Sequence, residues 1–187
     1  MELYSIFANH IWSIGYDGHE KDVLTELFEN WIDILYLSEY FDKNEYLLNN
    51  SFWCGYTKEE LINETFNEAI TFNNYLYDLY VNCQNGTIPD FDDLFKKLSP
   101  NENVWTLEKE KAYSIPIIKH HPSMLRLYAI KIQSNAYVIT GGGIKLVEKM
   151  QETEDLRIEL QRLQATRNWL KYYDVDEIND LKELENT

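Results

Sequence analysis

The amino-acid sequence predicts an α+β domain: a small, mainly antiparallel sheet with helices packed on one face, and a long C-terminal helix. Apolar residues recur at helical spacing over residues 20–40 and 57–83, the period changes to two from residue 111, and helical spacing returns from residue 153. Helices that precede a run of strands, with one closing helix, are typical of the α+β class. No internal repeat divides the chain.

Length and composition predict a single domain over residues 1–187. The chain is 44% hydrophobic and 14% aromatic, which is typical of neither disordered nor collagen-like proteins. No run approaches the ~18 apolar residues that a membrane span needs, and the N-terminus lacks the pattern of a signal peptide. Two cysteines, Cys54 and Cys83, are too few for a disulfide framework. We therefore expect a cytoplasmic protein with no membrane contact.

Charge is distributed unevenly along the chain, whose formal net charge is −15. Residues 1–100 carry five Lys and Arg against 18 Asp and Glu, whereas residues 111–149 carry six against one. The domain is therefore expected to have an acidic strand–helix–helix part (1–100), a β-meander with the C-terminal helix (101–173) and an acidic tail (174–187). A basic island on an acidic body can bind a phosphate locally; the alternative is that its lysines only solubilise strand edges.

In the first half of the chain, residues 1–16 are rich in β-forming side chains and predict a strand or a bent pair of strands. Residues 20–40 predict a helix. Thr57 and Glu60 have the spacing of a capping box, which opens the clearest helix of the chain. Residues 90–98 predict a short amphipathic helix, whose aspartates suit a helix start better than a calcium-binding loop.

In the second half, residues 112–119, 125–132 and 137–140 predict three strands, the last two joined by a hairpin turn. The triple glycine at residues 141–143 is expected to end the last of them. The C-terminal helix is expected to run from about residue 153 to residue 173, with acidic side chains in its first turn.

The triple glycine does not match a nucleotide-binding loop, because GGGIK differs from GxxxxGK[ST] and no Ser or Thr follows Lys145. A bulge or a turn with positive φ explains the glycines; alternatively, their uncovered N–H groups beside Lys145 offer an anion an approach. The neighbouring His120 and His121 would face opposite sides of a strand and cannot hold one metal there. No motif of a serine, cysteine or zinc hydrolase is present. We expect no metal and no cofactor.

Arg126, Tyr128 and Lys145 are the candidate catalytic residues. Arg126 and Tyr128 are two residues apart and therefore share one face of a strand, and Lys145 follows the strand paired with it. An arginine and a lysine can stabilise the charge of a reacting phosphodiester, and a tyrosine can stack on a base or move a proton. The alternative is that Tyr128 belongs to the core and Arg126 is a surface cation. The candidate nucleic-acid-binding residues are Lys119, Lys131, Lys149 and Arg162.

The strand LRLYAIKI, a second strand and GGGIKLVEKMQE before a basic helix resemble the C-terminal half of RelE/HigB-like type II toxins. In the phage-derived HigB-like branch, the last strand runs into a segment of the form G-F-x-K-K-x-x-K. Gly142, Lys145 and Lys149 match this form, whereas Gly143 replaces its aromatic residue and Leu146 replaces its second lysine.

The resemblance covers residues 111–171 and implies a metal-independent endoribonuclease that cleaves ribosome-bound mRNA by attack of the 2′-OH on the adjacent phosphate. It implies neutralisation by a small helix-turn-helix antitoxin. Under this resemblance Arg126 is the transition-state cation, Lys145 a phosphate ligand and Tyr128 a stacking or proton-transfer group.

The acidic first half favours a different class of function. A non-enzymatic interaction protein from a mobile-element or defence locus would use an acidic helical face to bind a basic partner. A housekeeping protein with an unidentified ligand is a third alternative. Loss of growth arrest on substitution of Arg126 or Lys145 would separate the toxin from the interaction protein.

Overall fold

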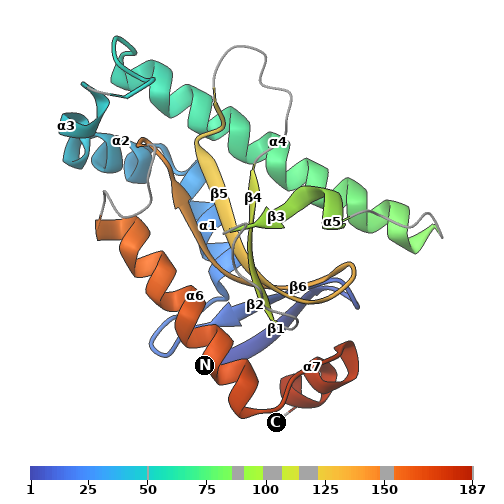
Figure 1. The fold of residues 1–187 in the computed structure, drawn as a ribbon. Coiled ribbons are helices and arrows are strands. Elements are labelled where there is room, and N and C mark those ends of the chain that lie inside the picture. Colours follow the sequence, from blue (N-terminus) through green and yellow to red (C-terminus); the bar gives the residue numbers. More distant parts are fainter. Residues whose placement is uncertain (50, 86–90, 99–106, 114–121, 148–153, 187) are drawn as a thin grey trace.

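The computed structural model describes residues 1–49, 51–85, 91–98, 107–113, 122–147 and 154–186. The strands in these ranges are β1 (Glu2–Phe7), β2 (Ile11–Gly15), β3 (Phe95–Lys97), β4 (Glu108–Tyr113), β5 (Leu125–Gln133) and β6 (Ala136–Ile144). The helices are α1 (Val23–Ile32), α2 (Ile34–Lys43), α3 (Glu45–Leu48), α4 (Lys58–Gln84), α5 (Phe91–Leu94), α6 (Glu154–Tyr172) and α7 (Ile178–Glu185). Figure 1 shows their arrangement.

The strands form one six-stranded sheet in the order β1-β2-β6-β5-β4-β3. The pairing of β2 with β6 is parallel, and the other four pairings are antiparallel. The predicted α+β class and the mainly antiparallel sheet are therefore confirmed. The bent pair of strands at the N-terminus is also confirmed, because β1 and β2 form a hairpin whose turn holds Asn9 at a φ of 67°.

Helices cover both faces of the sheet, which corrects the predicted packing on one face. Leu125, Leu127 and Ala129 of β5 pack in one apolar cluster with α1, α2 and α4. Tyr128 and Ile130 pack in a second cluster with α6 and α7, on the opposite side in Figure 1. The reason lies in β5 itself: nearly every residue of the strand is buried, so both of its faces need a cover.

Several element boundaries differ from the sequence predictions. The helix expected over residues 20–40 is two helices, because the Asp33 carboxylate caps a new helix by accepting from the N–H groups of Leu35 and Tyr36. The helix expected over residues 90–98 is limited to α5, since residues after Leu94 pair with β4 as strand β3.

Other boundaries agree with the predictions. The capping box of Thr57 and Glu60 opens α4, which is 27 residues long, and α6 begins and ends within one residue of its predicted bounds. The acidic tail contains a helix that the sequence analysis did not expect: α7 packs against β1 and buries Leu181. Among the described helices, none is both long and apolar enough to cross a membrane.

Strand β6 continues through the triple glycine, so the predicted strand end at Gly141 is wrong. A Cβ at Gly141 would overlap the Glu159 carboxylate, and one at Gly142 would lie 2.5 Å from the carbonyl oxygen of Arg126. The register with β5 shifts opposite this point, which is the bulge that the sequence left open. Positive φ is not the cause, because the described glycines with positive φ are Gly18 and Gly55. The α6 carboxylate and the β5 backbone approach these two positions so closely that only glycine, which has no side chain, fits there.

Candidate functional site

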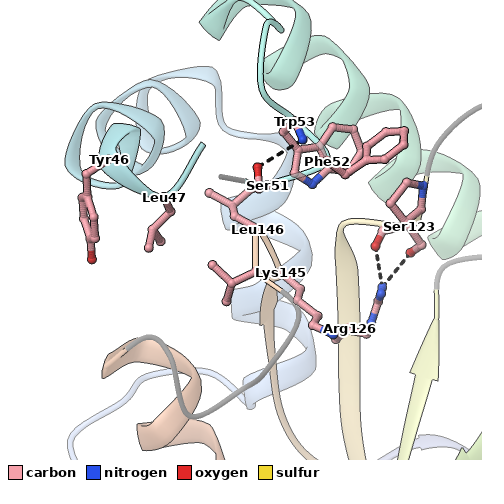
Figure 2. A pocket seen from close by; sticks show the side chains of 11 residues that line it. Tyr46, Leu47, Ser51, Phe52, Trp53, Ser123, Arg126, Lys145 and Leu146 are labelled. Carbon is pink, nitrogen blue, oxygen red and sulfur yellow. Dashed lines mark hydrogen bonds between the residues drawn. The ribbon is translucent and has the colours of Figure 1, made fainter. Parts of the chain in front are cut away.

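Arg126 and Lys145 line one cavity of about 620 Å³ at the end of the β5–β6 pair. In the register of the sheet Arg126 pairs with Gly143, and the N–H of Lys145 donates to the Met124 carbonyl over 2.7 Å. This pairing brings the two cations to the same end of the sheet, as the sequence pattern predicted. Figure 2 shows the cavity and its side chains. It is lined by Tyr46, Leu47, Ser51, Phe52, Trp53, Pro122, Ser123, Arg126, Lys145, Leu146 and Val147.

The Arg126 side chain is 6% exposed and is fixed at the start of β5. Its Nη1 donates to the Leu125 carbonyl over 2.6 Å, to the Ser123 carbonyl over 2.7 Å and to the Ser123 hydroxyl over 3.0 Å. Figure 2 shows the two bonds to Ser123. The guanidinium is therefore a positioned cation in the wall of the cavity rather than a mobile surface charge.

A buried carboxylate lies behind Ser123. Glu68 of α4 is 2% exposed and accepts from the N–H groups of Met124 and Leu125 over 3.0 and 2.9 Å, and from the Ser123 hydroxyl. Burial raises the pKa of Glu68, and these hydrogen bonds together with the charge of Arg126 offset part of the rise. The Ser123 hydroxyl therefore connects the carboxylate to the guanidinium and has a fixed orientation.

Exposed aromatic rings form the rim of the cavity, and sequence reasoning missed them. Phe52 is 54% exposed and Tyr46 is 67% exposed, whereas Trp53 is buried beside Phe52 with ring centroids 5.1 Å apart. Figure 2 shows Phe52 and Trp53 on the side of Ser123, and Tyr46 on α3 across the cavity. The only signal in the sequence was the aromatic cluster SFWCGY between two helices.

Tyr128 does not line this cavity. Its side chain is 1% exposed and belongs to the apolar cluster under α6 and α7. This placement fits the core alternative for Tyr128. Alternation along β5 puts Arg126 and Tyr128 on the same face, as predicted, but α6 covers that face at Tyr128 while Arg126 lies at the strand end.

Lys131 and Arg162, the two predicted nucleic-acid-binding residues that the structure describes, do not line the cavity. The Nζ of Lys131 lies 3.1 Å from the Asp92 carboxylate and 5.7 Å from the ring centre of Tyr137, near the β5–β6 turn. Arg162 of α6 contacts Glu159 over 2.9 Å and covers the Tyr16 ring. Lys119, Lys149 and the pair His120-His121 lie outside the described residues.

A second cavity, of about 330 Å³, lies between α1, α2, α6 and the glycine segment of β6. Its lining includes the carboxylates of Glu26, Asp155 and Glu159 and the rings of Tyr36 and Tyr40. Glu159 is buried and accepts from the N–H of Gly142 over 3.0 Å. Burial raises the pKa of Glu159, and Arg162 opposes the rise.

The two cavities differ in the chemistry that they offer. Among the described residues of the first, two are cationic and none is acidic, so it suits an anion with a flat apolar group beside it. The second suits a cation, because its carboxylates outnumber its cations. In the described parts of the chain, no group of three or more His, Cys, Asp or Glu side chains is placed to hold a metal ion.

Comparisons of the chain with protein-family models, with curated proteins and with solved structures find no match.

Proposed function

We propose that the cavity of Arg126 and Lys145 binds single-stranded RNA, and that the chain is a toxin-like protein of a type II toxin–antitoxin system that cleaves ribosome-bound mRNA. The observation that carries the proposal is the convergence of two cations with exposed aromatic rings, in a chain whose net charge is −15. A cavity whose described lining residues include no carboxylate, in so acidic a protein, favours an anionic ligand.

The cavity supplies what a single-stranded nucleic acid needs. Lys145 is half-buried at the wall and can contact a phosphate directly, and the fixed guanidinium of Arg126 adds positive potential from behind. Phe52 and Tyr46 offer exposed rings on which bases can stack. Glu68 and Ser123 act as positioning residues in this proposal: Glu68 holds the Ser123 hydroxyl, and Ser123 accepts from Arg126.

Cleavage in this proposal is the attack of a ribose 2′-OH on the adjacent phosphorus. The 2′-OH gives up its proton to water, the bond from phosphorus to the 5′ oxygen breaks, and the leaving 5′ oxygen takes up a proton from water. The product carries a 2′,3′-cyclic phosphate. Negative charge develops on the non-bridging oxygens, where Lys145 and Arg126 stabilise it. A small helix-turn-helix antitoxin is the proposed protein partner, in line with the resemblance of residues 111–171.

The first experiment measures binding of a fluorescent single-stranded RNA by anisotropy and its cleavage in buffer with EDTA. Lys145→Ala should weaken binding and reduce the salt dependence by roughly 0.7 in the slope of log K against log salt, which is the loss of one phosphate contact. Phe52→Ala should weaken binding by about 1–3 kcal/mol through lost stacking. Lys171→Ala removes an exposed lysine at the end of α6 and is the matched control.

Tightly induced expression in a bacterial host tests the toxin part of the proposal. Growth arrest by the wild type, relieved in Lys145→Ala and retained in Lys171→Ala, is the expected result. RNA binding without cleavage or arrest would reject the ribonuclease and leave an RNA-binding protein. A wild type that neither binds RNA nor arrests growth would reject both.

A second candidate function is a non-enzymatic interaction protein that binds a basic partner. The acidic cavity lined by Glu26, Asp155 and Glu159 is the observation that favours it. Titration with a lysine- and arginine-rich peptide distinguishes the two functions: binding that is lost in Asp155→Lys and unchanged in Lys145→Ala supports the interaction protein.

A further inference from the structure

A cysteine and a histidine from distant parts of the chain meet at the turn between β1 and β2. Cys83 lies in the last turn of α4, and its Sγ is 2.7 Å from the Nε2 of His10. The Nδ1 of the same ring lies 3.0 Å from the carbonyl oxygen of Asn135, in the turn between β5 and β6. This pair is separate from both cavities described above.

The contact with Asn135 determines which ring nitrogen carries the proton. A carbonyl oxygen only accepts hydrogen bonds, so the Nδ1 of His10 must be the donor. In the neutral ring the Nε2 then holds a lone pair, and this nitrogen faces the thiol of Cys83. The thiol is thus the donor to a nitrogen that can take its proton.

The histidine ring is held in this orientation. It stacks on Phe91 with centroids 5.5 Å apart and planes 24° apart. The main chain of His10 is fixed at both ends of the residue, since its N–H donates to Phe7 and its carbonyl accepts from Tyr137. A nucleophile, a base in contact with it and a third group that orients the base together form the arrangement of activated cysteines.

The position of Cys83 at a helix end and the groups around it are consistent with a base at His10. Cys83 lies at the C-terminal end of α4, where the helix dipole does not favour an anion, and His10 is the group in contact with it that can accept the thiol proton. Among the described residues, Asp92 follows Phe91 and is engaged elsewhere: its carboxylate accepts from the Asn135 N–H and the Tyr137 hydroxyl and pairs with Lys131. Tyr80 of α4 stacks on Phe7.

We infer that Cys83 is a nucleophilic thiol with His10 as its general base, and that it is a site of covalent modification by disulfides of small thiols. The thiol proton moves to His10, and the Cys83 sulfur attacks one sulfur of the disulfide. A new S–S bond forms as the original S–S bond breaks, and the leaving thiolate takes the proton. No other oxidant is required, because the disulfide itself is reduced.

Cys54 provides an internal control. It is exposed, and the hydrogen bonds among the described residues include none to its Sγ. The variant Cys54→Ser leaves Cys83 as the reactive cysteine, and Cys83→Ser leaves Cys54. Both keep His10.

The experiment measures the rate of reaction of each variant with 5,5′-dithiobis(2-nitrobenzoate) from mildly acidic to alkaline pH. Although half-buried, Cys83 should react at least about tenfold faster than Cys54 at acidic pH, because His10 supplies a thiolate that a free thiol lacks there. Adding His10→Gln to Cys54→Ser should abolish the excess at acidic pH. Mass spectrometry after exposure to oxidised glutathione should then find the adduct on Cys83.

Two results would overturn the inference: Cys83 reacting no faster than Cys54 at any pH, or an excess that persists in His10→Gln. Circular dichroism of each variant checks its fold. If His10→Gln does not fold, the pH profiles of the two single cysteine variants decide the question alone. Cys54→Ser keeps the pair of Cys83 and His10, whereas Cys83→Ser keeps only the isolated thiol of Cys54.

Discussion

Two cavities lie at the end of the β5–β6 pair, and they carry charges of opposite sign. Lys145 lines the basic cavity, while the preceding residues Gly143 and Ile144 line the acidic one. Near each cavity, a buried glutamate from a helix accepts backbone N–H groups at or near the strand ends: Glu68 for β5 and Glu159 for β6. A buried glutamate therefore anchors the backbone beside both cavities, and the other side chains that line each cavity determine the sign of its charge.

The difference between the cavities lies in what accompanies the buried glutamate. Ser123 and Arg126 lie between Glu68 and the basic cavity, and none of the described residues that line this cavity carries a carboxylate. Glu159 lines the acidic cavity itself, together with Asp155. A buried glutamate can thus be either structural support for a cationic site or part of an anionic one.

The largest expected effect is on stability, from Glu68→Ala. Removing the carboxylate leaves the buried N–H groups of Met124 and Leu125 without their acceptor, which should lower the free energy of unfolding by about 3 kcal/mol. Urea unfolding measures the change. Asp78→Ala removes an exposed acid from the same helix and should change stability by less than about 0.5 kcal/mol. Equal losses in both variants would contradict the anchoring role.

Gly141→Ala should destabilise the protein through the packing around the acidic cavity and leave the basic cavity intact. The new methyl group would occupy the place of the Glu159 carboxylate, so we expect a loss of about 2 kcal/mol in the free energy of unfolding. In a Glu159→Ala background the same substitution should cost clearly less, and a double-mutant cycle by urea unfolding measures this coupling. RNA binding at the basic cavity should be retained in whatever fraction stays folded. Additive losses would show that the glycine is needed for another reason.

The pH dependence of stability distinguishes the buried glutamates from Asp92. Burial raises the pKa of Glu68 and Glu159 above the ordinary value of 4.5, so their contribution to stability falls as pH rises through the window above 4.5. The free energy of unfolding of Glu68→Gln and of Glu159→Gln, relative to that of the wild type, should therefore increase as pH rises through that window. Urea unfolding at several pH values measures this difference, and a difference independent of pH would contradict the raised pKa values.

Asp92 should behave in the opposite way. Burial alone would raise its pKa, but hydrogen bonds from Tyr137, Asn135, Lys131 and Ser134 lower it to about 2 from 3.8. The stabilisation, of about 1 kcal/mol because solvent screens this partly exposed group, is present above pH 3.8 and is lost as the pH falls toward 2. In Asp92→Asn the free energy of unfolding, measured by urea unfolding at several pH values, should no longer show this loss at acidic pH.

The features that the sequence predicted are those that local chemistry or strand pairing determines. Thr57 and Glu60 satisfy each other within one turn, so the start of α4 could be located without tertiary information. Arg126 and Lys145 were placed together because adjacent antiparallel strands bring their ends into register.

The features that the sequence missed depend on contacts between distant segments. The strand end predicted at Gly141 was wrong because the carboxylate that needs the space comes from α6. Glu68 lies at helical spacing with Thr65 and Phe72, and only the fold shows that this face is buried against Met124 and Leu125. Phe52 lies in a loop without periodicity, and no local rule assigns it to a cavity.

The smallest expected effect tests whether the two cavities influence each other. Asp155 lines the acidic cavity, so its charge should repel an RNA bound at the basic one only through solvent. Asp155→Asn should therefore raise RNA affinity by no more than about twofold at low salt, and the gain should vanish near physiological ionic strength. Anisotropy titrations at two salt concentrations measure it, with Asp78→Asn as the control for a distant exposed acid. A gain above about tenfold would show that RNA contacts the acidic cavity directly, because a screened charge cannot produce it.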